Sequence, residues 1–270
     1  SDIIGLDPRI VYLEHQTNQG LATTRNTGIK AARGNYIAYL DDDDLYLPHH
    51  LEILVSWLET TGAAAVYGDA HRVWHRKHGD RYITVLRDLA YSVDFDRNAL
   101  LLSNYFPVLC VVHKRECLDK IGLFDPYLRR TEDWDLWLRL AREYDLVHVP
   151  VQTCEFSWRD DQSSMTSKVR DAFDWAELNI HYKVRDLAAK DPTTKDAHDK
   201  LIIGAFTRLR NALCLGLTKP GQSPSKNFLA GTPEQIIERL KFLAPYYPGE
   251  QDYICELMAV LYIELGQMQS

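Results

Sequence analysis

Hydrophobic and polar positions follow two different patterns along the chain, and the change falls near residue 166. Before it, short apolar runs alternate with segments of helical period, in β-α-β-α order. This order predicts an α/β domain with a mainly parallel sheet and helices against it. Strands are predicted over residues 9–15, 35–40, 63–69 and 108–114, a hairpin over 71–86 with its turn at Gly79 and Asp80, and helices over 21–34 and 48–61, closed by Gly34 and Gly62.

From about residue 167 the pattern is helical. Two long helical segments come first, a break rich in Pro, Gly and Ser follows at residues 218–227, and two shorter helices come after it. Thr232 is expected to cap one of these shorter helices. We therefore divide the chain into an α/β domain over residues 1–166 and a helical region over residues 167–270.

Four consecutive aspartates, Asp41, Asp42, Asp43 and Asp44, follow an apolar run at residues 36–40. The run is typical of a strand covered on both faces, so the aspartates are expected at its carboxyl end, where open α/β sheets bind ligands. A hard divalent cation, Mg²⁺ or Mn²⁺, would relieve the repulsion between adjacent carboxylates. A solvated acidic turn before the next helix would explain the same residues, and the run alone does not decide.

A second acidic pair, Glu132 and Asp133, follows Thr131, a predicted helix cap. A carboxylate at a helix end can point into a cleft and accept a proton from a hydroxyl group, which makes Asp133 a candidate general base. The alternative is that both acids only stabilise the helix dipole. Apolar residues at helical spacing behind the pair are expected to face the core: Trp134, Trp137, Leu138 and Ala141.

Composition excludes several classes of protein. With 31 Lys and Arg against 38 Asp and Glu, a formal charge of −7 and no basic cluster, nucleic acid is not an expected partner. The five cysteines are widely spaced and form no CxxC pair, which indicates reduced core thiols and a cytoplasmic protein. No apolar stretch has the length of a membrane span, and no signal peptide opens the sequence.

Four blocks in chain order, at residues 18–52, 66–69, 121–141 and 157–166, resemble the family 2 glycosyltransferases of the GT-A fold. The resemblance implies a Rossmann-like, mixed and mainly parallel sheet flanked by helices, followed here by a helical C-terminal region. It implies a metal-dependent, inverting transfer of a hexosyl or deoxyhexosyl group in polysaccharide biosynthesis. The donor would be a nucleoside-diphosphate sugar, UDP- or dTDP-linked first, and the acceptor a hydroxyl of a glycan or lipid-linked molecule.

The same resemblance assigns roles to the acidic residues. Asp41 and Asp43 match the Asp-x-Asp motif that holds Mn²⁺ or Mg²⁺ on the donor diphosphate, with Asp43 as the direct ligand. Asp133, in its pair with Glu132, matches the base that deprotonates the acceptor hydroxyl. Peripheral association with the inner face of the membrane is compatible with a lipid-linked acceptor.

Other residues are predicted to bind the donor. Arg25 would pair with the diphosphate, although a helix-surface arginine would look the same. Asp69 would contact a sugar or only cap a turn, and residues 159–163 would close over the diphosphate or form an ordinary polar loop. The predicted donor-binding residues are Arg25, Asp41, Asp42, Asp69, Arg159, Gln162 and Ser163.

Three further residues have more ordinary interpretations. Gly28, inside a helical segment, indicates a close backbone approach, by packing rather than by ligand access. His49 and His50 are expected on the surface at a helix start, and not as metal ligands.

The sequence departs from the family pattern at its start. Family members begin with a strand-helix-strand unit that holds the base and ribose, and a βαβ unit needs roughly 30 residues. We therefore expect the nucleotide-binding half to be incomplete in this chain. Two alternatives stay open: a scaffold whose helical region binds a partner, and a sugar-phosphate nucleotidyltransferase with a Gly-rich phosphate loop upstream.

Overall fold

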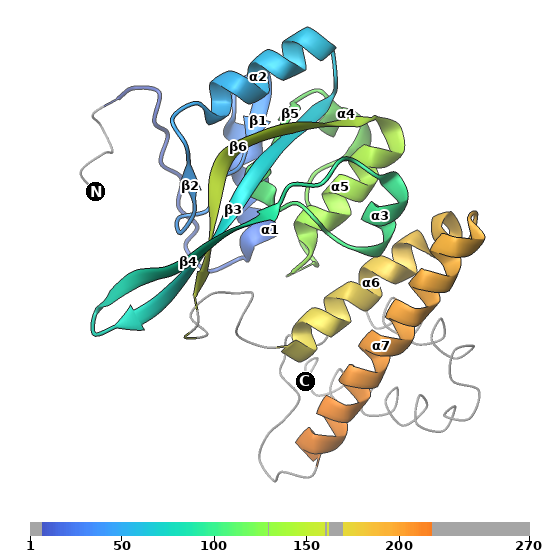
Figure 1. Ribbon diagram of the computed structural model, residues 1–270. Coiled ribbons are helices and arrows are strands. Elements are labelled where there is room, and N and C mark those ends of the chain that lie inside the picture. The colour runs from blue at the N-terminus through green and yellow to red at the C-terminus, as the bar shows by residue number, and fades with distance from the viewer. Residues whose placement is uncertain (1–6, 129, 160, 162–169, 218–270) are drawn as a thin grey trace.

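The computed structural model describes residues 7–128, 130–159, 161 and 170–217 of the chain. Figure 1 shows a twisted sheet with helices against it, and a pair of long helices, α6 and α7, side by side at one end. In chain order the elements are α1 (Leu21–Ala31), β1 (Tyr36–Ala38), β2 (Leu45–Tyr46), α2 (His50–Thr61), β3 (Ala65–His78), β4 (Arg81–Tyr91), α3 (Arg97–Leu102), the 3₁₀ helix η1 (Val108–Cys110), β5 (Val111–Lys114), α4 (Cys117–Ile121), α5 (Glu132–Glu143), β6 (Leu146–Arg159), α6 (Arg170–Ala188) and α7 (Pro192–Leu217).

The sheet has the strand order β1-β5-β3-β6-β2, with β4 paired to the outer half of β3. The prediction of a mixed sheet flanked by helices is confirmed. Within the described residues only β3 and β6 pair in parallel, so the expectation of a mainly parallel sheet is wrong. The β3–β4 hairpin gives one physical reason, because a tight turn, here at Gly79 as predicted, can join only antiparallel strands.

Several predicted elements differ from the structure, among them the first strand and the first helix. Residues 9–15 form no strand, and Ile10, Val11, Tyr12 and Leu13 are exposed. No described strand pairs with this segment, and without a partner its backbone groups have no ladder to join. The first helix ends at Ala31 rather than at Gly34, whereas Gly62 closes α2 in the left-handed conformation as predicted.

Helices cover both faces of the sheet (Figure 1). On one face α2 packs Leu54 and Leu58 against Val66 of β3 and its neighbours in β5 and β6. On the other face Trp137 of α5 lies in a larger cluster that includes Tyr67 of β3. Adjacent residues of β3 therefore point to opposite faces of the sheet and pack against different helices, as the two-residue period of a strand requires.

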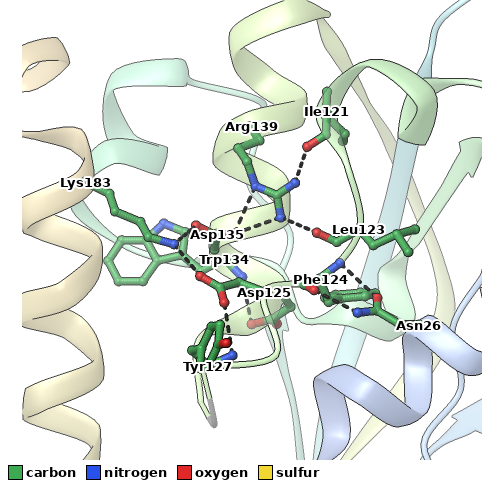
Figure 2. A network of polar contacts seen from close by, with 11 residues as sticks. Asn26, Ile121, Leu123, Phe124, Asp125, Tyr127, Trp134, Asp135, Arg139 and Lys183 are labelled. Atoms are coloured by element: carbon green, nitrogen blue, oxygen red, sulfur yellow. Dashed lines mark hydrogen bonds and ion pairs between the residues drawn. The ribbon is translucent and has the colours of Figure 1, made fainter. Parts of the chain in front are cut away.

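The first turn of α5 is fixed from two directions (Figure 2). Asp135 is buried and accepts hydrogen bonds from Arg139 at 2.8 Å and from Lys183 of α6 at 2.7 Å. Arg139 also donates to the carbonyl oxygens of Ile121 and Leu123. Because Asp135 lies two residues after Asp133 in the same helical turn, these bonds hold the start of α5, which bears the predicted acidic pair, in place.

The C-terminal prediction is tested only in part. Two long helices follow residue 167 as expected, whereas the shorter helices, including the one at Thr232, lie outside the described residues.

Cys110, Cys117 and Cys154 are buried free thiols, as predicted for core cysteines. Of the helices described, none has the length and apolar character to cross a bilayer.

Gly68, in the middle of β3, has no room for a side chain. A Cβ atom there would lie 2.5 Å from Oγ1 of Thr153, a fully buried residue of β6. We expect Gly68→Ala to lower the free energy of unfolding by about 1–3 kcal/mol in chemical denaturation, because the two strands must move apart. Gly28→Ala is the matched control, since nothing lies within 4 Å of its Cβ position and alanine favours the helix by about 1 kcal/mol. Equal effects of the two substitutions would contradict the packing explanation.

Candidate active site

The aspartate run lies where the chain crosses from one edge of the sheet to the other. β1 precedes the run and β2 follows it, and these strands occupy opposite ends of the strand order. Tyr39 is buried just before the run, and the hydroxyl of Tyr46 donates to the Tyr39 carbonyl, which fixes both ends of the crossing. Residues 41–44 themselves form a turn, closed by the backbone N–H of Asp44, which donates to the Asp41 carbonyl at 3.2 Å.

Arg25, from α1, joins the two acidic motifs. Its side chain is only 8% exposed; Nη2 donates to Asp41 at 2.8 Å and Nη1 to Glu132 at 2.6 Å. The guanidinium also lies 5.5 Å from the ring centre of Phe124. The interpretation as a helix-surface arginine is therefore excluded. The predicted contact with a donor diphosphate stays a prediction, because this guanidinium already pairs with two carboxylates.

Glu132 and Asp133 begin α5, as predicted, but the helix start is unusual. Thr131 occupies the cap position with φ 59°, and it is the one non-glycine residue of positive φ in the described part of the chain. Its hydroxyl donates to the carbonyl of Arg130 and caps no N–H group of the helix. The expected capping role of Thr131 is therefore wrong. A backbone conformation of this kind is strained, and such strain concentrates at functional sites.

Asp133 is held by two hydrogen bonds. Its Oδ1 accepts from the backbone N–H of Trp134 at 2.8 Å, and its Oδ2 from Nδ2 of Asn104 at 3.1 Å. Burial raises the pKa of Asp133, against the charge of Arg25 and these two bonds. Burial, with the negative charge of Asp133, raises the pKa of Glu132 to about 7. The raised pKa makes Asp133 a stronger proton acceptor than an exposed aspartate.

Asn104 was not found from the sequence. It lies after α3, 29 residues before Asp133, in a loop with no pattern that marks it. Its Oδ1 is buried and has no hydrogen-bond partner among the described residues.

The second half of the aspartate run contacts β6. The backbone N–H of Ser157 donates to Asp44 at 2.9 Å, and the Ser157 hydroxyl donates to the carbonyl of Asp43. Nη2 of Arg159 lies 3.9 Å from Oδ2 of Asp43. Burial raises the pKa of Asp44 to about 7, and the charges of Asp43 and Asp41 add to this effect. The crowded carboxylates would therefore be stabilised by a bound cation.

Other predicted residues are placed less centrally. Asp69 does not end a strand, because β3 continues to His78, so its interpretation as a turn cap is wrong. Its buried carboxylate accepts from the Ser92 hydroxyl at 3.0 Å and lies 2.7 Å from Nε2 of His148. These contacts do not bring Asp69 to the other predicted site residues. Asp42 is exposed in the run. Two predicted residues, Gln162 and Ser163, lie outside the described residues.

One histidine prediction is wrong. His50 is 1% exposed, and its ring stacks on Tyr46 at 3.7 Å between centroids, because the first turn of α2 packs onto β2. His49 lies nearer the surface, with Nε2 3.1 Å from the carbonyl oxygen of Gln152.

A groove of about 360 Å³ runs between α1 and the edge strand β1 and ends at Arg25 and Asp41. Gly28 lines this groove, and the open space beside it contradicts the expectation that the glycine serves packing. The groove is lined by Arg25, Gly28, Ile29, Ala32, Tyr36, Ile37, Ala38, Tyr39, Leu40 and Asp41.

Comparison with known proteins finds glycosyltransferases similar to this chain. Residues 1–106 match the sequence model of Glycosyl transferase family 2. YwdF of Bacillus subtilis (strain 168), an uncharacterized glycosyltransferase, is 33% identical over 152 residues, which cover 56% of this chain and 55% of that protein. WfgD of Escherichia coli, named as a UDP-Glc:α-D-GlcNAc-diphosphoundecaprenol β-1,3-glucosyltransferase, is 27% identical over 161 residues, which cover 60% of each protein.

A solved structure agrees at the level of the fold. S. aureus TarS 1-349 in complex with UDP-GlcNAc superposes with a TM-score of 0.51 at 12% identity, over 84% of this chain and 63% of that one. The chain spans little more than half the length of the curated relatives it matches. The first 106 residues of the chain are therefore similar to glycosyltransferase family 2, and the solved structure shows that the fold is shared.

Proposed function

We propose that the protein transfers a glycosyl group from a nucleoside-diphosphate sugar to a hydroxyl group of a glycan or lipid-linked acceptor, with inversion at the anomeric carbon. The observation that carries the proposal is the link Asp41–Arg25–Glu132, with bonds of 2.8 and 2.6 Å. It joins the predicted donor motif to the helix start that bears Asp133. A scaffold has no need for this arrangement, because burying Arg25 and Glu132 is costly unless their charges are paired.

The reaction is a single displacement. The acceptor oxygen bonds to the anomeric carbon as the bond from that carbon to the diphosphate oxygen breaks. Asp133 takes the proton of the acceptor hydroxyl, and Asn104 keeps the Asp133 carboxylate oriented through its 3.1 Å hydrogen bond. Asp133 lies in a protein environment that raises its pKa, so the proton is accepted more readily than by an exposed aspartate.

A divalent cation fits the donor set in part. Asp43 and Asp41 offer hard carboxylate oxygens, and Arg25 already pairs with Asp41, which leaves Asp43 as the proposed ligand. Within the described ranges no three His, Cys, Asp or Glu side chains are placed to hold a metal by themselves. Mg²⁺ and Mn²⁺ sites in phosphate-handling enzymes need only one or two carboxylates, with substrate phosphates completing the shell. When bound, the cation would neutralise charge on the departing diphosphate.

The donor is proposed to be a UDP-sugar. The name of WfgD states UDP-Glc as its donor and a diphosphoundecaprenol-linked sugar as its acceptor, and the TarS crystals contain UDP-GlcNAc. The groove that ends at Arg25 and Asp41 is the proposed donor site, because it leads directly to the carboxylates that would meet the diphosphate.

A thermal-shift panel with UDP, dTDP and GDP, each with and without Mn²⁺, tests the donor site. At 100 times its dissociation constant a nucleotide stabilises the folded state by about 2.7 kcal/mol, which is a shift of several degrees in melting temperature. We expect UDP with Mn²⁺ to give this shift and Asp43→Ala to abolish it. Asp186→Ala, which removes an 87% exposed carboxylate from α6, should keep the shift. Equal shifts without metal, or in Asp43→Ala, would contradict the assignment of Asp43.

The Asn104 bond predicts a change in pH dependence. Asn104→Ala removes a donor that stabilises the ionised form of Asp133, so the pKa of that carboxyl should rise. Because the base must be ionised to accept a proton, the acid limb of the pH–rate profile should move to higher pH, by up to about one unit. Asn98→Ala, an exposed position on α3, is the control and should leave the profile unchanged. An unmoved limb in Asn104→Ala would show that this bond does not act on the base.

A further inference from the structure

The β3–β4 hairpin extends beyond the rest of the sheet (Figure 1). Pairing between β3 and β6 ends at His75 and Arg159, and beyond that point only β3 and β4 continue, to the turn at Gly79. We call residues 72–89 the finger.

The finger exposes apolar side chains along β4. Nearly the whole strand is solvent-exposed, although its residues favour β structure and would suit a covered surface. Such a concentration on one projecting element differs from the isolated apolar residues that soluble surfaces normally show. The exposed fractions are 37% for Tyr82, 47% for Ile83, 47% for Val85, 55% for Leu86 and 52% for Leu89.

Aromatic rings lie at the base of the finger. Trp74 and Trp158 contact each other at 5.4 Å between centroids, and both are half-buried. Nε1 of Trp74 donates to Asp88 at 3.0 Å, and the guanidinium of Arg72 lies 4.7 Å from the Trp74 ring. Tryptophan, with an apolar body and a polar edge, is the residue type enriched at the boundary between membrane and water.

The charge of the finger is opposite to that of the chain. Residues 72–89 hold five Lys and Arg against two Asp, in a protein whose formal charge is −7. One of the two acids, Asp88, is paired with Arg72 at 2.6 Å. Arg87 is likewise paired, with Glu155 of β6 at 3.4 Å. The exposed cations Lys77 and Arg81 flank the turn beside one acid, Asp80, and favour an anionic partner over a second finger of the same charge.

We propose that the finger docks the protein on an anionic phospholipid surface. Ile83 and Leu86 would enter the interface between headgroups and acyl chains, while basic side chains such as Lys77 and Arg81 would meet the lipid phosphates. The inference does not rest on the proposed sugar transfer, because it concerns binding to a surface and is tested without a donor or acceptor.

Co-sedimentation of the full chain with vesicles tests the proposal. We expect binding to phosphatidylcholine vesicles that contain phosphatidylglycerol, weakening with added salt, and little binding to phosphatidylcholine alone. Removing each cationic side chain near the surface should weaken partitioning by about fivefold, so Lys77→Glu with Arg81→Glu should weaken it by at least 25-fold. The matched control, Lys190→Glu with Lys200→Glu, makes the same charge change on exposed positions outside the finger.

The apolar half of the proposal has its own variants. Ile83→Ser with Leu86→Ser should release the protein from anionic vesicles, whereas Leu201→Ser, at a position 41% exposed on α7, should not. Circular dichroism of each variant should match the parent, because these side chains are exposed. Absence of binding to anionic vesicles, or equal binding by all variants, would overturn the proposal. So would a concentration-dependent dimer that the finger variants abolish, because it would make a second copy the occupant.

Discussion

Replacing Asp133 by asparagine is expected to lower turnover by about 10²- to 10⁴-fold, the range that a general base contributes. The amide has almost the shape of the carboxylate and can still accept the Trp134 N–H at 2.8 Å, so the fold should be kept. What it loses is the ability to take a proton. Nucleotide-induced thermal shifts should be unchanged, because the proposed donor site is formed by other residues.

A buried acid on the same helix provides the contrast. Asp135→Asn weakens the bonds to Arg139 and Lys183, at 2.8 and 2.7 Å, and should lower the melting temperature. Turnover per folded molecule should change far less than in Asp133→Asn. If Asp133→Asn retained full turnover, its role as base would be refuted; if both variants lost turnover in parallel with stability, the effect of Asp133 would be structural.

Removing Arg25 is expected to have the largest effect on stability. Arg25→Ala leaves Asp41 and Glu132 without their shared cation, and the loss of one partner from a buried ion pair lowers the free energy of unfolding by about 3–5 kcal/mol. Arg25→Lys should recover only part of this, because one ammonium group cannot reproduce the two-sided contact. Arg9→Ala is the control: Arg9 pairs with Asp7 at 2.5 Å but is 88% exposed, and its loss should not be measurable.

The loss of stability caused by Arg25→Ala should depend on pH. The pKa of Glu132 is about 7 in the folded state and 4.5, its ordinary value, in the unfolded chain. Between these two pH values the folded protein keeps the proton on Glu132 and the unfolded chain releases it. A raised folded-state pKa gives stability that is complete below the unfolded pKa and is lost as pH rises through the folded one. Without Arg25 the pKa rises further, so urea denaturation should show a larger deficit at about pH 8 than at about pH 5. A deficit independent of pH would mean that lost packing, not charge, is responsible.

The elements best predicted from the sequence are those with a local signal. α2 and α5 have apolar residues at helical spacing, and Gly62 adopts the left-handed conformation that ends α2. The strand of residues 63–69 and the hairpin of residues 71–86 were both predicted, but not that the strand and the first arm of the hairpin form one continuous strand, β3. The three-residue length of β1 and its place at the sheet edge follow from pairing, which is a property of the whole sheet.

The site divides in the same way. Residues 41–44 and Asp133 were recognised from local patterns, whereas their partners are distant in sequence: Ser157 lies 113 residues from Asp44, and Asn104 lies 29 from Asp133. Arg25 was recognised, but its two carboxylate partners were not, because only the packing of α1 against the start of α5 makes the arginine a buried one. Local patterns therefore identified the acidic residues of the candidate site, whereas their hydrogen-bond and ion-pair partners follow only from the tertiary structure.

β3 pairs with β6 from Ala65 to His75, with register shifts at Asp69, so the finger and the contact of Ser157 with the aspartate run lie on the same pair of strands. Ser157, which bonds the aspartate run, lies opposite Val73, five residues before the end of β3 at His78. At about 3.3 Å per residue, the part of β3 beyond the Ser157 contact is roughly 17 Å long. With the tip resting on a lipid surface, the length of this ribbon would set the height of the proposed site above the headgroups. Sugars near the headgroups would then come within reach of Asp133, and those further along a growing chain would not.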